Sequence, residues 1–144
     1  MALDKGVIAA RLAALEQYLR LLDELGSLDF NSYVSDPRNY GAAERFLHLA
    51  IECIFDVGAH IIASLGLERP NRYADILPCL ARAGVIGEGT ASRLDSLAGF
   101  RNVLVHDYVR LDRNRVYEFA RNRLDELRGF AREVAEFLGR YADA

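Results

Sequence analysis

The chain has 144 residues, of which 51% are hydrophobic and 27% are charged, and its formal net charge is −3. This composition excludes an intrinsically disordered protein, and the length suits one domain over residues 1–144. A negative net charge excludes a protein that coats polyanions through an overall positive field. Cys53 and Cys79 lie in apolar sequence with no secretory leader before them, which predicts reduced, buried thiols and a cytoplasmic protein.

The first half of the chain predicts two long helices. Apolar residues repeat at helical spacing over residues 3–25, and residues 27–33 suit a connector or a short helical turn. Asp36 and Pro37 then favour a helix start, because Asp caps helix N-termini and Pro fits the first helical position. We expect this second helix, which ends near Leu65, to be the longest.

The second predicted helix also raises the question of a membrane. Residues 46–67 are long and apolar enough to cross one, but Glu52, Asp56 and His60 lie within them. Charged groups inside a bilayer are costly. We therefore expect a core helix of a bundle and no membrane partner.

The second half predicts three further helices. One covers residues 70–84, with Tyr73 facing inward and Pro78 expected to tighten, kink or divide it. The next starts near Thr90 and ends in a polar cluster, and the last is capped by Asp112 and continues past Phe137. No strand pattern competes. The prediction is an all-α, up-and-down bundle of four main helices plus a short fifth helix.

The polar cluster occupies residues 98–108 and is the densest group of chemically capable side chains in the chain. Its members are Arg101, Asn102, His106, Asp107 and Tyr108. At 100° per residue, Arg101 and Tyr108 lie within about 20° of each other, whereas Arg101 and His106 are about 140° apart. Either the helix ends or bends near His106, or a second copy completes the site across a two-fold axis. We favour the second explanation, with a helix end at Asp107 to Tyr108 contributing.

The chemistry of the cluster suits RNA cleavage without a metal ion. Histidine is the side chain whose unperturbed pKa lies near working pH, so His106 suits proton transfer. Arg101 can clamp a phosphate with its permanent charge, and Asn102 can orient the imidazole or donate to a phosphate oxygen. Taken singly, Arg101 could be an interface ion-pair partner and His106 a core histidine. Residues 101–123 also hold six Arg against three acidic residues, which suits a phosphate-bearing partner, although a solvated helix face is the commoner meaning.

A second polar series runs along the second predicted helix at steps of four residues. Its members are Glu44, His48, Glu52, Asp56 and His60. A metal site is one interpretation, but the matching Glu-x-x-His pairs of dinuclear bundles are absent from the sequence. A structural row, or a supporting shell for the polar cluster, fits better. Asp56 and His60 lie deepest in apolar sequence, so we expect these two, with Asp107, to support the cluster.

At these residues the chain resembles a known family. Arg101, four residues, His106, one residue and Tyr108 match the Arg-x4-His-x-Tyr signature of HepT-like toxins, a branch of the HEPN superfamily. Residues 49–60, 66–73 and 99–111 also look like that family. The resemblance implies a HEPN-like homodimer whose Arg and His motifs meet at the two-fold interface as a metal-independent ribonuclease site, with no cofactor.

The resemblance also implies a partner. HepT-like toxins pair with an MntA-like minimal nucleotidyltransferase antitoxin, which is linked to AMP transfer onto the motif tyrosine, here Tyr108. A phenol in line with Arg101 could attack an ATP α-phosphate, although from sequence alone a packing residue with a solvated hydroxyl is the safer interpretation of Tyr108. The alternative function is a non-catalytic dimeric module that docks a nucleotidyltransferase and is modified by it, which the acidic charge and the lack of a base-stacking surface favour. A helical-bundle metalloprotein is a third interpretation.

Overall fold

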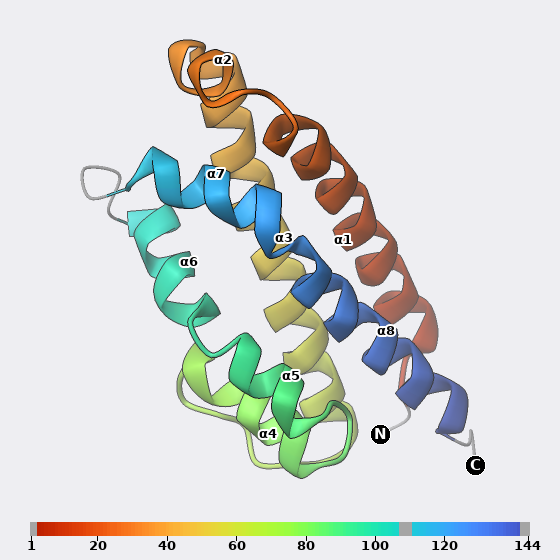
Figure 1. Ribbon diagram of the computed structural model, residues 1–144. Coiled ribbons are helices and arrows are strands. Elements are labelled where there is room, and N and C mark those ends of the chain that lie inside the picture. The colour runs from red at the N-terminus through yellow and green to blue at the C-terminus, as the bar shows by residue number, and fades with distance from the viewer. Residues whose placement is uncertain (1–2, 107–110, 142–144) are drawn as a thin grey trace.

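The structure is a computed structural model that describes residues 3–106 and 111–141, with His106 described in its backbone alone. Its regular elements, over this part of the chain, are all helical (Figure 1). Helix α1 (Lys5–Gly26) runs antiparallel to α3 (Pro37–Ser64), and the short α2 (Phe30–Ser35) connects them. The Asp36 carboxylate accepts from the backbone N–H of Arg38 with Pro37 at the first position of α3, which confirms the predicted start of the longest helix.

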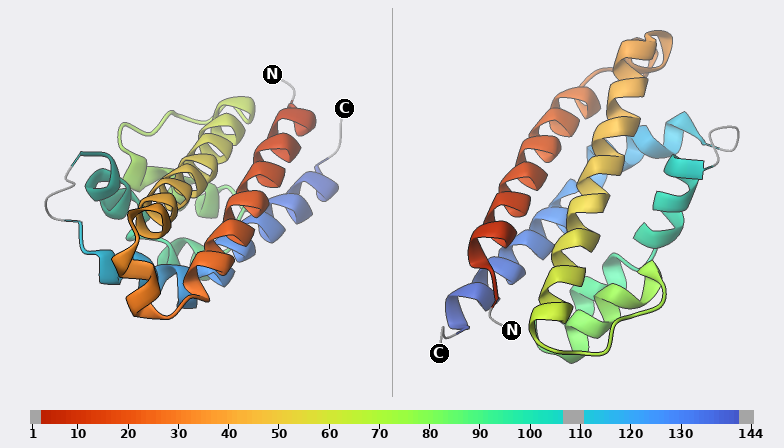
Figure 2. Two further views of the ribbon diagram at one scale, coloured as in Figure 1. Left: turned by 90° about the horizontal axis from the view of Figure 1, so that it is seen from above. Right: turned by 180° about the vertical axis from the view of Figure 1, so that it is seen from behind.

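Helix α3 is the central element of the fold. Its inward side chains Leu47, Ile51, Ile54 and Ile61 are fully buried, and α1, α6 and α7 all pack against it (Figure 2). Length and composition alone would let α3 cross a membrane, but 56% of its apolar window is buried inside this chain. The helix therefore serves as the core of the bundle, as its internal charges predicted.

The third predicted helix begins later than expected. Instead of starting near Pro70, the chain forms a 3-10 turn η1 (Tyr73–Asp75) and then α4 (Ile76–Arg82). Pro78 neither kinks nor divides α4, because it lies in the first turn, where a missing N–H removes no intrahelical hydrogen bond. Tyr73 is 41% exposed, so the prediction that it faces inward is wrong.

The other two predicted helices are each divided. Residues 88–106 form α5 (Glu88–Arg93) and α6 (Leu97–His106), and the last helix is α7 (Arg113–Asn122) followed by α8 (Leu124–Arg140). Arg123 leaves the helical conformation at φ −122° and donates to the carbonyl of Arg93 at 2.9 Å. This contact ties the α7–α8 corner to the end of α5. The apolar spacing continues through Arg123, so periodicity alone could not show the break.

The contact between α3 and α4 brings η1 toward α6. A Cβ placed on Gly58 would lie 2.6 Å from Cγ2 of Ile76, so the two helices approach as closely as they do only because position 58 has no side chain. The predicted all-α bundle is confirmed: α1, α3, α6 and the α7–α8 pair are its main helices, and α4 and α5 cover one end (Figure 1).

Candidate functional site

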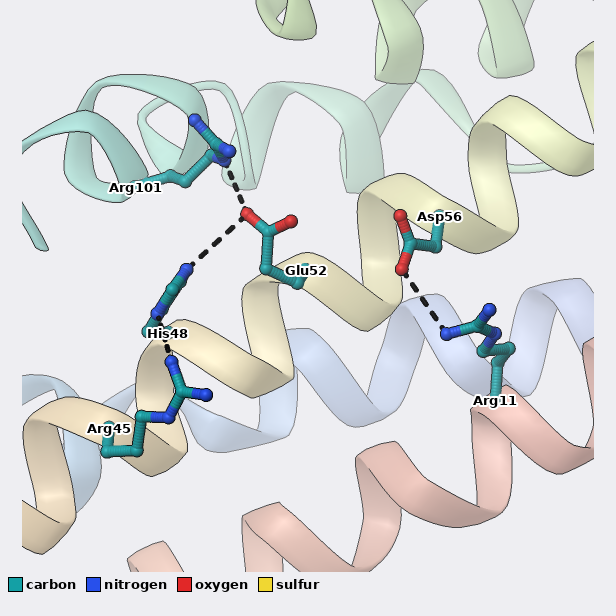
Figure 3. A network of polar contacts seen from close by, with 6 residues as sticks. All are labelled: Arg11, Arg45, His48, Glu52, Asp56 and Arg101. Carbon is teal, nitrogen blue, oxygen red and sulfur yellow. Dashed lines mark hydrogen bonds and ion pairs between the residues drawn. The ribbon is translucent and has the colours of Figure 1, made fainter. Parts of the chain in front are cut away.

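The candidate site is centred on Arg101, in the middle of α6. Its side chain is only 16% exposed, and its Nε donates to Oε1 of Glu52 on α3 (Figure 3). The guanidinium carbon also lies 4.2 Å from the centroid of the Tyr73 ring. One carboxylate and one aromatic face therefore hold the cation in place, which limits the conformations that the long side chain can adopt.

Glu52 links Arg101 to His48, one helical turn earlier on α3. Nε2 of His48 lies 3.7 Å from Oε1 of Glu52, and its Nδ1 is 3.2 Å from Nη1 of Arg45 (Figure 3). A guanidinium can only donate, so Nδ1 accepts and the proton of the neutral ring is assigned to Nε2, on the side of Glu52. Burial lowers the pKa of His48, and Arg45 and Arg101 lower it further, while Glu52 opposes them. Together these contacts favour the neutral imidazole over the imidazolium.

The structure describes two of the three residues expected to support the cluster. Asp56 faces α1, where Oδ2 lies 3.4 Å from Nη1 of Arg11 (Figure 3), and burial is the main cause that raises its pKa. His60 keeps a buried Nε2 with no hydrogen-bond partner among the described residues. The row member in contact with Arg101 is instead Glu52. Depth in apolar sequence indicates burial but not the direction in which a side chain faces.

The remaining cluster residues lie at the end of α6 or after it. Asn102 is exposed beside Arg101, and α6 is helical as far as His106. The Cα positions of Arg101 and His106 are accordingly about 140° apart around the helix axis. Asp107 and Tyr108 lie outside the described residues. Within one chain, α6 therefore does not bring Arg101 and His106 to the same face.

The arginines that follow the cluster have structural roles. Each of four guanidiniums lies over an aromatic ring, at 4.0 to 5.3 Å from its centroid: Arg113 over Tyr40, Arg115 over Phe100, Arg121 over Tyr117 and Arg123 over Phe119. Arg121 also donates to the carbonyl of Gly26, at 3.1 Å. Tyr40 lies on α3 and Phe100 on α6, so Arg113 and Arg115 connect α7 to neighbouring helices, whereas Tyr117 and Phe119 belong to α7 itself.

The metal interpretation of the helix row finds no matching geometry in the described residues. Within residues 3–106 and 111–141, no group of three or more His, Cys, Asp or Glu side chains is placed to hold a metal ion. His48 and Glu52 are the row members that come together, and the partner of Glu52 is a guanidinium. The acidic residues of the row therefore form ion pairs with arginines from two other helices. Glu52 pairs with Arg101 of α6, and Asp56 pairs with Arg11 of α1.

The chain is thus an all-α bundle with a largely covered arginine, Arg101, in the middle of α6. The family described as "Ribonuclease HepT-like" matches residues 15–134, so the chain belongs to the HepT-like ribonuclease family. This confirms the resemblance inferred from Arg101, His106 and Tyr108. The tRNA nuclease HepT of Aphanizomenon flos-aquae is 24% identical, over 92% of this chain and 90% of the relative.

Two solved structures have the same fold. YutE of Bacillus subtilis, described as a cytosolic protein, is 28% identical, with a TM-score of 0.83 and coverage of 96% of this chain and 93% of YutE. A tri-AMPylated HEPN toxin of Shewanella oneidensis in complex with its MNT antitoxin has a TM-score of 0.82 at 21% identity, over 90% of this chain and 97% of that one. At that identity the second likeness establishes the fold alone.

Replacing Glu52 by Gln is expected to lower the pKa of His48 further. The carboxylate is the group that favours the imidazolium, whereas burial, Arg45 and Arg101 all oppose it and remain in the variant. An NMR titration of the His48 imidazole, assigned by its loss in His48→Gln, measures the change. Glu24→Gln, at an exposed position of α1, is the control and should leave the titration unchanged. An unchanged or raised pKa in Glu52→Gln would contradict the network described above.

Proposed function

We propose that this chain is the toxin of a toxin-antitoxin pair and cleaves RNA without a metal ion, at a site formed by Arg101 and His106 at a homodimer interface. The observation that carries the proposal is the restrained guanidinium of Arg101, five residues before His106 on one helix of a HepT-like ribonuclease fold. A fixed cation and an imidazole are the two groups that attack by a ribose 2′-OH requires.

The proposed reaction is transfer within the RNA strand. An imidazole takes the 2′-OH proton, the oxygen attacks the adjacent phosphorus, and the bond from phosphorus to the 5′-oxygen breaks. The leaving oxygen receives a proton, so the products are a 2′,3′-cyclic phosphate and a free 5′-OH. The dimer supplies two copies of His106, one to accept a proton and one to donate it. Arg101 and His106 of one chain lie about 140° apart around the axis of α6. In a two-fold dimer, Arg101 of one protomer can instead act together with His106 of its partner.

In this mechanism Arg101 stabilises the charge that builds up on the phosphate oxygens. Glu52 engages Nε of Arg101, and a phosphate would bind through the terminal guanidinium nitrogens. Glu52 thus acts as a positioning residue through Arg101. Asn102, exposed on the next position of α6, is the candidate to orient His106 or to donate to a phosphate oxygen.

We infer that an MntA-like nucleotidyltransferase neutralises the toxin by transferring AMP to Tyr108. The Shewanella oneidensis neighbour is a tri-AMPylated toxin bound to an MNT antitoxin, which supports the same relationship here. The phenol oxygen would attack the ATP α-phosphate and release pyrophosphate, with loss of the phenolic proton. AMP two residues from His106 would add negative charge and bulk where an RNA strand must pass.

A second candidate function is a non-catalytic dimer that docks the nucleotidyltransferase and serves as its substrate. The observation that favours it is the ion pair itself, because Glu52 already compensates the charge of Arg101 before any phosphate binds. The two functions differ in what the purified dimer does to RNA.

Incubation of the purified protein with transfer RNA in excess chelator tests the proposed function. Transfer RNA is the first substrate to try because the Aphanizomenon flos-aquae relative is a tRNA nuclease. We expect unchanged cleavage after metal removal, with 2′,3′-cyclic phosphate ends detected by mass spectrometry. Cleavage that stops in chelator and returns with Mg²⁺ would contradict the mechanism. Intact RNA together with AMP transfer to Tyr108 would support the docking module instead.

A further inference from the structure

A cavity of about 400 Å³ lies directly beside the candidate site. Helix α3, the loop of residues 69–72 and η1 enclose it. Its apolar lining consists of Phe55, Ala59, Ile62, Ala63, Pro70 and Ile76. The polar residues that line it are Arg69, Asn71 and Arg72, together with Asp56, whose carboxylate pairs with Arg11 on α1. Tyr73 is shared by the cavity and the candidate site. It lines the cavity, and its ring centroid lies 4.2 Å from the guanidinium carbon of Arg101.

We propose that this cavity binds one unpaired base of the RNA strand whose phosphate is held at Arg101. The inference rests on the proposed function and adds a substrate-recognition subsite to it. A base and its own phosphate are joined by a single ribose, and here the cavity wall and the phosphate-binding cation share one aromatic ring. A strand bound at Arg101 therefore places a neighbouring base at the mouth of the cavity.

The lining of the cavity suits a flat aromatic ring. Phe55 and Ile76 are buried beneath it, while Ala59 and Ala63 on α3 are exposed and small, which leaves room above the helix. Phe55 packs edge-on against Tyr73 with ring centroids 5.1 Å apart, so the exposed tyrosine ring is supported from below. Unpaired RNA bases are recognised by stacking on such aromatic side chains and by hydrogen bonds to their edges.

The polar rim fits a nucleotide better than an apolar protein segment. Arg69 and Arg72 are exposed cations at the mouth, and Arg72 is held by Asp75 through two bonds of 3.1 Å. Asn71 offers both a donor and an acceptor for the edge of a base. A surface that packed against a second copy of the chain would instead be depleted of charge at its centre. The exposed Tyr73 also supplies the base-stacking surface that the sequence did not reveal.

The test compares RNA binding by variants that fill the cavity. The probe is a short unstructured RNA with 2′-O-methyl riboses, which cannot be cleaved, and the same strand with abasic positions. Ala59→Leu fills the cavity from α3, and Ala10→Leu, at an exposed position of α1, is the matched control. We expect the wild type and Ala10→Leu to bind the intact strand about tenfold more tightly than the abasic strand, and Ala59→Leu to lose this preference.

Substitutions of Tyr73 provide the second measurement. Tyr73→Phe keeps the ring and should keep the base preference, whereas Tyr73→Leu should lose it. Equal preference in the wild type, Ala59→Leu and Tyr73→Leu would overturn the subsite and leave the proposed function intact. An Ala59→Leu protein that becomes monomeric by sedimentation would also overturn it, because a second copy would then occupy the cavity. Full cleavage activity in Arg101→Ala and His106→Ala would instead contradict the proposed function.

Discussion

Replacing His106 by Ala is expected to lower RNA cleavage by about 10²- to 10⁴-fold, the usual contribution of a general acid or base. In a homodimer the substitution removes both copies of the imidazole, so proton transfer to and from the ribose and the leaving oxygen is lost together. The measurement is the single-turnover rate on transfer RNA, alongside growth of cells that express the variant. We expect the variant to relieve growth arrest.

A loss of activity in His106→Ala reports on catalysis only if the proposed dimer is retained, so sedimentation and thermal unfolding of the variant are measured alongside. Arg20→Lys, at an exposed position of α1, is the matched control for Arg101→Lys and should retain wild-type activity. Arg101→Lys keeps the positive charge but loses the planar fork, and should fall between the wild type and His106→Ala. Unchanged toxicity of a dimeric His106→Ala protein would contradict the catalytic assignment.

Replacing Tyr108 by Phe is expected to abolish AMP transfer to the toxin. Phe lacks the phenol oxygen that would attack the ATP α-phosphate, while the ring and its packing are retained. Cells that express the variant with an MntA-like nucleotidyltransferase should then stop growing, as they would without the antitoxin. Incorporation of labelled AMP into the purified protein provides the direct measurement.

Tyr18→Phe is the matched control for this experiment. Tyr18 stacks on Phe46 with ring centroids 6.3 Å apart, in the contact between α1 and α3, and its substitution should leave AMP transfer unchanged. We also expect the growth arrest caused by Tyr108→Phe to require ribonuclease activity. Cells that express the double variant Tyr108→Phe and His106→Ala should therefore grow normally. AMP incorporation into Tyr108→Phe at the wild-type level would place the acceptor on another residue.

Local sequence was sufficient to predict where several helices begin. Asp36 before Pro37 and Asp112 before α7 both cap helices in the structure, because capping depends on one side chain and the backbone N–H groups two or three positions later. The central position of α3 was also predictable, since its apolar stripe is broad and the charged residues within it favour a core helix. These features need no information from distant parts of the chain.

The division of the later helices was not predictable from local sequence. Arg123 stops α7 in the middle of a continuous apolar pattern, and its side chain bonds to the carbonyl of Arg93, thirty residues earlier. Tyr73 lies in a sequence that also suits the inner face of a helix, yet the 3-10 turn exposes its ring beside Arg101. Both outcomes depend on which segments meet in the folded chain.

Some features of the candidate site could likewise be predicted from local sequence, and others could not. The family could be inferred from Arg101, His106 and Tyr108 at their fixed spacing, and the all-α fold from the helical period of the apolar residues, because both depend on residues close together in the chain. The contact of Arg101 with Glu52, instead of Asp56 or His60, and the position of Tyr73 between the guanidinium and the cavity depend on how distant segments pack. The sequence spacing does not distinguish the five row residues of α3, which follow one another at steps of four. The packing of α6 and η1 against α3 determines that Glu52 is the one that contacts Arg101.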